Sequence, residues 1–392
     1  MLYVRWPCLN RMWHMRILFL LALSLVLPGT VRATTLDITY NLAPPEAQVA
    51  IDHAAGIWES ALVSPVPIKV LVTWAPLGTS TLGITFPNGR RDFAGAPLPQ
   101  TWYATSLANS IAGAELNLGE NDIEIYFSSS FNWYFGTDGG PSNGQYDLVS
   151  VALHELGHGL GFVGLSKVVD ADGSFGLLQA SDFSPLITTF PWPQLDTLPG
   201  VFDRYLTHAQ NGPLVLMDNP GVALGDAQTS NQVYFNGPLA MAANAGISPR
   251  IYAPSTFALG SSCVHLNEST YPVGNPNELM TPFISSGEAN HWPGPLCLAM
   301  LQDIGWALAP DVGMLENTGA MAVLAYPNPA HDRIWFAFPD GSRSDVIMII
   351  DAQGRTIRTL PFATSVDVRD MSPGTYVLHV SGSAIKARFT KE

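Results

Sequence analysis

The feature that most constrains this 392-residue chain is a pair of histidines four positions apart, His154 and His158, with Glu155 directly after the first. The preceding residues are apolar and Asp147 can cap a helix, so the sequence predicts a helix from residue 148 to about residue 160. A spacing of four places both imidazoles on one helix face, where they can bind the same Zn²⁺. Glu155 is then expected to act as general base toward a zinc-activated water. The alternative, two solvent-facing histidines on a surface helix, fits poorly because the helix is so apolar.

A third zinc ligand does not follow at short spacing. Gly161 stands three residues beyond His158, and in this respect the stretch resembles the metzincin metallopeptidases, in which a glycine ends the helix. The usual metzincin pattern has the third ligand three residues later, but that position is Gly164, which has no side chain to bind a metal. The ligand must come from elsewhere, and the candidates are His53, His208, His265 and His291.

Two local features favour His265, which follows Ser262-Cys263 and precedes the sequence Asn-Glu-Leu-Met-Thr-Pro at 277–282. That sequence resembles the metzincin Met-turn, in which a methionine, here Met280, packs beneath the zinc-binding imidazoles. A late third histidine followed by such a turn resembles the leishmanolysin branch, in which an inserted segment, here residues 165–264, separates it from the helix. The resemblance covers residues 120–165 and 260–306. It implies an α+β metzincin-like zinc peptidase domain over residues 34–310 with ligands His154, His158 and His265, and His291 is the next candidate.

The cysteines predict a disulfide. Cys8 lies in the N-terminal segment, so Cys263 and Cys297 are the two that remain in an exported chain, where they can pair. The bridge would bracket His265 and Met280 and hold them against the catalytic helix. Two buried free thiols are the alternative.

The N-terminus predicts export. Residues 17–27 are an apolar run preceded by arginines and followed by Val31-Arg32-Ala33, which is the order of a secretory signal peptide over residues 1–33. A membrane anchor fits less well, because a helix of this length rises about 16 Å, roughly half of a bilayer core. No later segment is long and apolar enough to span a membrane, so the mature chain is expected to lack a transmembrane segment.

Composition excludes other classes. Apolar residues make up 47% and charged residues 13%, which argues against intrinsic disorder. Of 18 basic residues, four lie in the first 33, so the 14 that remain after cleavage face 32 acidic ones. This charge balance argues against nucleic-acid or membrane-surface partners.

Periodicity predicts the other elements of the first domain: strands at 36–40, 67–74 and 123–127, and helices at 45–62 and 297–306. Residues 165–260 are rich in Gly, Pro, Asn and Asp, so we expect long loops there. The turns at Asp138 and at Asp170-Ala171-Asp172 could contribute to a Ca²⁺ site, although plain turns use the same residues.

From residue 324, after a linker at 311–323, short alternating runs between turn signals predict a small all-β sandwich to residue 392. Its sequences at 325–330, 351–355 and 372–376 resemble the type IX secretion sorting domain. The resemblance implies a partnership with the type IX secretion machinery, translocation across an outer membrane, and secretion or attachment to the cell surface. A carbohydrate-binding or adhesive sandwich is the alternative.

The sequence therefore predicts a secreted zinc metalloendopeptidase, a hydrolase that cleaves protein or peptide substrates with Glu155 as general base. Two alternatives stay open: a catalytically silent surface adhesin that keeps the zinc fold, and a zinc hydrolase of a non-peptide substrate such as a deacetylase. The presence of Glu155 argues against the adhesin.

Overall fold

The computed structural model of the protein describes residues 34–186, 188, 196–309, 324–337, 346–351, 355–381 and 386–392. The predicted signal peptide (1–33) and linker (311–323) lie outside the described residues. Within the described ranges, no helix combines the length and the apolar character that crossing a bilayer requires.

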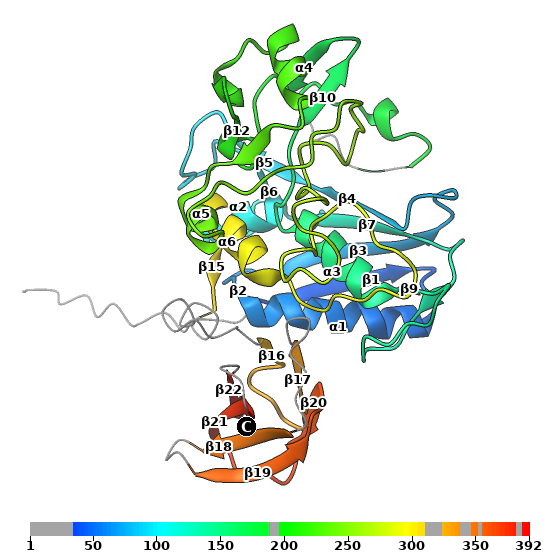
Figure 1. Ribbon diagram of the computed structural model, residues 1–392, viewed down its shortest axis with the longest axis vertical. Coiled ribbons are helices and arrows are strands. Elements are labelled where there is room, and N and C mark those ends of the chain that lie inside the picture. Colours follow the sequence, from blue (N-terminus) through cyan, green and yellow to red (C-terminus); the bar gives the residue numbers. More distant parts are fainter. Residues whose placement is uncertain are drawn as a thin grey trace, which may run out of the picture. The chain divides into compact units, whose positions relative to one another are not determined.

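A four-stranded sheet with the order β1-β3-β7-β4 organises the first part of the chain (Figure 1). β1 (Leu36–Asn41), β3 (Ile68–Ala75) and β7 (Ile123–Ser128) are parallel, and β4 (Gly83–Pro87) pairs antiparallel with β7 at the edge. Alternate apolar side chains of the central strands are buried, as the period of a strand requires. The structure therefore has the three predicted strands and adds the edge strand β4.

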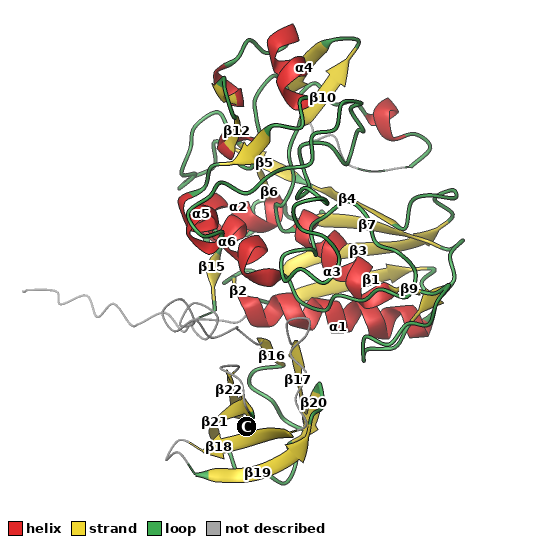
Figure 2. Ribbon diagram, viewed as in Figure 1, coloured by secondary structure: helices red, strands yellow, loops and turns green. Residues whose placement is uncertain are grey.

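Two helices, α1 (Pro45–Ala61) and α3 (Leu148–Gly159), pack against each other beside this sheet (Figure 2). Pro45 begins α1. Proline has no backbone N–H, but in the first turn of a helix this group has no intrahelical acceptor, so no hydrogen bond is lost. The Trp58 indole N–H donates a hydrogen bond of 2.9 Å to the Leu153 carbonyl and so ties the two helices together.

The ends of α3 are set by local sequence. Asp147 caps the helix, because its Oδ1 accepts a hydrogen bond of 2.7 Å from the Ser150 N–H. After the last helical residue, Gly159, the chain turns at Gly161 with a φ of 111°, which glycine adopts without steric cost. The predicted helix over residues 148 to about 160 is therefore confirmed.

Short elements surround this core. Three two-stranded pairs are β2 (Leu62–Val63) with β15 (Ala307–Leu308), β5 (Gly89–Arg91) with β6 (Trp102–Ala104), and β8 (Trp133–Tyr134) with β9 (Tyr146–Asp147). The predicted loop region contains β10 (Ser166–Val169), β11 (Asp172–Phe175), β12 (Leu206–His208), β13 (Gly212–Pro213), β14 (Val233–Phe235), α4 (Val222–Gln228) and α5 (Pro238–Ala243). The remaining α-helices are α2 (Thr105–Ala112) and α6 (Gly294–Ile304), and α6 begins three residues before the predicted helix. Three short 3-10 helices are η1 (Ala180–Phe183), η2 (Asp203–Tyr205) and η3 (Leu214–Leu216).

Two antiparallel sheets form the C-terminal part. One contains β16 (Leu324–Tyr326), β17 (Arg333–Ala337) and β20 (Ser365–Asp367), and the other has the order β19 (Thr356–Pro361), β18 (Val346–Asp351), β21 (Gly374–Val380), β22 (Lys386–Lys391). Apolar side chains of both sheets, among them Ile334, Ile349 and Leu378, share one buried core. The alternation that predicted these strands places every second side chain in that core.

The predicted disulfide between Cys263 and Cys297 is wrong, because both cysteines are buried and free. The Cys263 thiol points to the Gln228 carbonyl oxygen at 3.6 Å, whereas Cys297 lies in the buried face of α6. Burial raises the pKa of both thiols, to about 12 for Cys263, so both stay protonated. The alternative of two buried free thiols describes the structure.

Candidate metal centre

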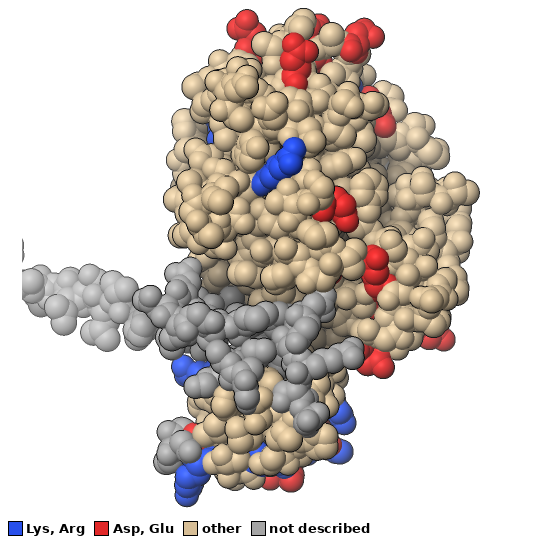
Figure 3. All heavy atoms as spheres, viewed as in Figure 1, with Lys and Arg blue, Asp and Glu red and all other residues tan. Residues whose placement is uncertain are grey.

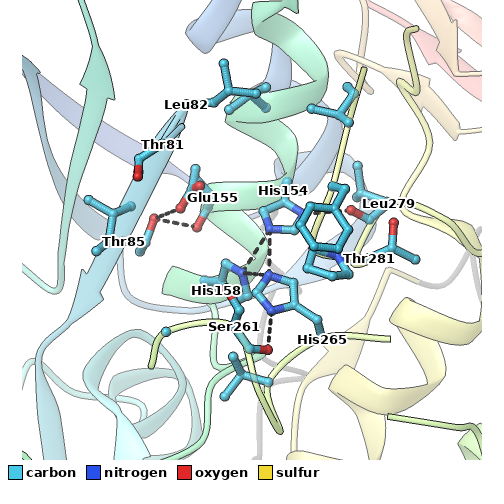
Figure 4. Close-up of a pocket in the computed structure, with 18 of the residues that line it drawn as sticks. Thr81, Leu82, Thr85, His154, Glu155, His158, Ser261, His265, Leu279 and Thr281 are labelled. Carbon is cyan, nitrogen blue, oxygen red and sulfur yellow. Dashed lines mark hydrogen bonds between the residues drawn. The ribbon is translucent and has the colours of Figure 1, made fainter. Parts of the chain in front are cut away.

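Three histidines converge from two distant segments. His154 and His158 project from one face of α3, and His265 comes from the long loop between α5 and α6 (Figure 4). Their Nε2 atoms lie 3.0 Å (His154 to His158), 3.1 Å (His158 to His265) and 3.2 Å (His154 to His265) apart. Of the four candidates for a third ligand, the structure therefore brings His265 to the pair on the helix.

A backbone carbonyl orients each ring. The Nδ1 atoms of His154, His158 and His265 lie 2.7, 2.6 and 2.8 Å from the carbonyl oxygens of residues 279, 162 and 261, respectively. Because a carbonyl oxygen can only accept, Nδ1 carries the hydrogen in each ring. Each neutral ring then presents the lone pair of its Nε2 to the centre of the cluster.

Burial keeps these rings neutral. It lowers the pKa of His265 to about 3, with help from the neighbouring His154, and it lowers the pKa values of His154 and His158 as well. Three lone pairs therefore face one another with no proton between them, an arrangement that a cation would stabilise.

The geometry fits a single zinc-like ion. A tetrahedral ion with Zn–N bonds of about 2.0–2.1 Å would hold its nitrogens roughly 3.3–3.4 Å apart, close to the separations in the cluster. Imidazole nitrogens suit Zn²⁺ and several other transition metals, and each ring already has the carbonyl partner typical of a metal-bound histidine. The three histidines could hold a metal ion.

Glu155 lies beside the cluster without belonging to it. Its Oε2 accepts a hydrogen bond of 2.6 Å from the hydroxyl of Thr85 on β4. Figure 4 shows Glu155 and Thr85 on one side of the histidines and Leu279 and Thr281 on the other. Burial raises the pKa of Glu155 to about 7, against the opposing effect of the Thr85 hydrogen bond. Such a carboxyl group can exchange a proton near neutral pH.

Thr85 was not predicted from the sequence. β4 is short and ends at a proline, but Thr85 lies between Ile84 and Phe86 in an alternating run. That alternation is the signal that could have identified the strand, although not its contact with Glu155.

Met280 packs against the same helix. It is fully buried, and a Cβ added at Gly157 would lie only 2.9 Å from its sulfur atom. The Met280 carbonyl accepts a hydrogen bond of 2.8 Å from the Leu266 N–H, next to His265. The Met280 segment therefore contacts α3 and the strand-like stretch that carries the third histidine.

The other candidate histidines lie elsewhere. His291 Nε2 is 2.8 Å from Asp147 Oδ1 at the start of α3, and the ring of His53 is 6.0 Å from the His291 ring. His208 lies on β12, where its Nδ1 accepts backbone N–H groups. Among the described residues, the three converging histidines are the only group of three or more His, Cys, Asp or Glu side chains close enough to share an ion. The possible Ca²⁺ site at Asp138, Asp170 and Asp172 therefore receives no support.

An open cleft of about 530 Å³ exposes the cluster. Residues 80–86, which include most of β4, line one wall, and residues 278, 279 and 281–284 line another. On the visible face in Figure 3, charged side chains are sparse on the larger part, and acidic groups outnumber basic ones.

Comparison with known proteins identifies two segments. Residues 324–390 match the family model described as the secretion system C-terminal sorting domain, and residues 113–178, which contain α3, match one described as SPBPB7E8-like. No curated protein and no solved structure matches the chain. The first match confirms the predicted type IX sorting domain. It indicates interaction with the secretion machinery and either secretion or attachment to the cell surface.

Proposed function

We propose that the chain is a zinc-dependent endopeptidase that acts outside the cell after type IX export. The observation that carries this proposal is the set of three neutral Nε2 atoms, 3.0–3.2 Å apart, beside the buried carboxyl group of Glu155 in an open cleft. A three-histidine set leaves a coordination position for water or substrate, which is typical of catalytic zinc sites.

His154, His158 and His265 would hold the ion, which when bound supplies Lewis-acid activation of water and of a carbonyl oxygen. The carbonyl partners of the three Nδ1 atoms fix the ring orientations and keep Nε2 free of a proton. The histidines therefore need little rearrangement on metal binding.

Glu155 would move the protons. It takes one from the attacking water and passes it to the leaving amine, as a general base and then a general acid. The Thr85 hydroxyl holds Oε2, and Oε1 makes no hydrogen bond within the described residues, so Oε1 can carry the transferred proton.

Strand β4 supports a peptide substrate over a small molecule. It is the edge strand of the sheet and lines the cleft next to Glu155. An extended peptide can add to an exposed strand edge through backbone hydrogen bonds, which would place a peptide bond beside the histidines.

The test uses the purified full-length protein. Metal analysis should find about one zinc per chain, and a chelator should abolish cleavage of a peptide library. Glu155→Gln should keep the metal but lose roughly 10²–10⁴ in rate, because Glu155 is a base and not a ligand. His265→Ala should lose most of the metal and the activity.

His331→Ala is the matched control, because this histidine is exposed and lies in the C-terminal part. It should retain metal and cleavage. Full activity in Glu155→Gln would remove Glu155 from the mechanism. A wild-type protein that binds zinc but cleaves no peptide would contradict the peptidase proposal and favour a binding protein or another hydrolase.

A further inference from the structure

The cleft carries more negative charge than the proposed reaction uses. Glu268, Glu278 and Glu288 line it in addition to Glu155, and among the described residues that line it there is no lysine or arginine. A substrate in this cleft therefore meets carboxylates without competing basic side chains, which favours positively charged groups on the substrate.

Glu268 differs from the other two glutamates. Glu288 accepts a hydrogen bond of 2.7 Å from the Ser285 N–H, and Glu278 accepts one from the Gly274 N–H. The Glu268 carboxyl group has a hydrogen bond with the Thr281 side chain, but its Oε2 is buried and has no hydrogen-bond partner within the described part of the chain. Burial raises the pKa of Glu268, the hydrogen bond with Thr281 opposes this effect, and the charge of Glu288 adds to it. A buried carboxylate oxygen without a partner is costly, and a cation would stabilise it.

Apolar side chains accompany these carboxylates. Leu259, Val273 and Phe283 line the same cleft, yet these residues are 37%, 59% and 64% exposed. Lysine and arginine side chains combine an apolar stem with a charged end, so they can cover such residues while the charge reaches a carboxylate. The aromatic ring of Phe283 could also contact the cation directly.

We propose that the cleft selects peptides with a lysine or arginine side chain near the scissile bond, and that Glu268 binds its charge. This inference rests on the peptidase function proposed above. A divalent cation is the other source of positive charge, but the described residues provide no third His, Cys, Asp or Glu side chain close enough to share an ion with Glu268 and Glu288. Two carboxylates suit one basic side chain better than an ion that prefers six or more oxygens.

The first test compares peptides that differ at one position, lysine against norleucine, placed in turn at each position around the cleaved bond. The ratio of the two kcat/KM values should be about ten or more in the wild-type protein at the best position, as expected for a charge-assisted contact. In Glu268→Gln this ratio should fall to about one. Glu46→Gln, an exposed glutamate on α1 outside the cleft, should behave as the wild type does. No preference in the wild type, or an unchanged ratio in Glu268→Gln, would overturn the proposal.

A second test does not depend on catalysis. Fluorescence anisotropy should show the lysine peptide binding more tightly than the norleucine peptide to full-length Glu155→Gln, with the difference lost when Glu268→Gln is added. If this holds but no peptide is cleaved, the basic-side-chain site stands and the peptidase proposal fails. The contrary outcome has two parts: Ca²⁺ from CaCl₂ binds the Glu155→Gln protein but not the protein with Glu268→Gln added, and the added Glu268→Gln leaves the preference for the lysine peptide unchanged. In that case the carboxylates form an ion site and our inference is wrong.

Discussion

The three histidines that converge share one contact, which is made by their Nδ1 atoms. His154, His158 and His265 each place Nδ1 against a carbonyl oxygen, which leaves Nε2 as an acceptor for a metal. His208 has the opposite arrangement, because its Nδ1 accepts N–H groups from residues 210 and 211. At this scale, the backbone around a histidine decides which ring nitrogen could bind a metal.

Asp203 carries another buried carboxyl group, in addition to that of Glu155. Its Oδ2 accepts hydrogen bonds from the N–H groups of Leu165 (2.9 Å) and Gly200 (2.8 Å), so it joins the turn after α3 to a later loop. Its Oδ1 is buried without a partner among the described residues. Burial raises the pKa of Asp203 to about 7, against the opposing effect of the two backbone hydrogen bonds.

This raised pKa predicts a pH-dependent stability. The folded protein keeps the proton on Asp203 up to about pH 7, whereas an unfolded chain loses it near pH 4. Because the folded state binds more protons between these values, the contribution of Asp203 to the free energy of unfolding falls as pH rises from about 4 to about 7. Asp203→Asn removes this titration. Relative to the variant, the wild type should lose about 1.4 kcal/mol per pH unit within this range.

Denaturant unfolding at pH 5, 6 and 7 measures this difference. Asp226→Asn, an exposed aspartate on α4, is the control and should follow the wild type at all three pH values. Parallel pH profiles for the wild type and Asp203→Asn would show that Asp203 does not titrate in this range.

At the scale of elements, the turn after α3 depends on a close approach at Gly164. A Cβ added there would lie 2.4 Å from Asp203 Oδ1 and 3.3 Å from Val264, the residue before His265. The space that a side chain at this position would need is therefore occupied by Asp203. This packing also shows why no ligand could project from residue 164.

Gly164→Ala should destabilise the fold by about 1–3 kcal/mol, as overpacking of a buried site does. It should also weaken metal binding, because the displaced Val264 precedes His265. Unfolding by denaturant and metal titration measure the two effects. Gly140→Ala is the control, because its nearest new contact would be 3.7 Å away and should change stability little. Equal stability of both variants would mean that the turn relaxes without cost.

The sequence predicted elements whose causes are local. The cap at Asp147 and the apolar run after it are adjacent in the chain, so α3 could be identified before its packing was known. His265 is 107 residues beyond His158, and only its sequence neighbours and a family resemblance favoured it over three other histidines. Thr85 and Glu268 depend on contacts between segments that local patterns do not encode. The disulfide prediction failed for the same reason, because spacing says nothing about where two thiols point.

At the scale of the whole molecule, the candidate site and the sorting domain use different parts of the sequence. Every residue that lines the cleft precedes residue 291. The strands after residue 324 have a buried core of their own, and they match the sorting-domain family over residues 324–390. Metal binding and peptide cleavage can therefore be tested separately from export.

Deletion of residues 324–392 should leave metal binding and chelator-sensitive cleavage in place, because the deleted strands supply none of the residues that line the cleft. In a host with a type IX secretion system, the truncated chain should remain inside the cell envelope, whereas the full-length chain should reach the surface or the medium. Fractionation with immunoblotting measures location, and the purified truncated protein is assayed for zinc and peptide cleavage.

A reporter protein carrying a signal peptide and residues 311–392 is the reciprocal control and should be exported. Export of the truncated chain would separate residues 324–392 from sorting. A purified truncated protein that no longer binds metal would instead show that these strands stabilise the metal centre, since a site held by α3 and the loop of His265 alone should survive their removal.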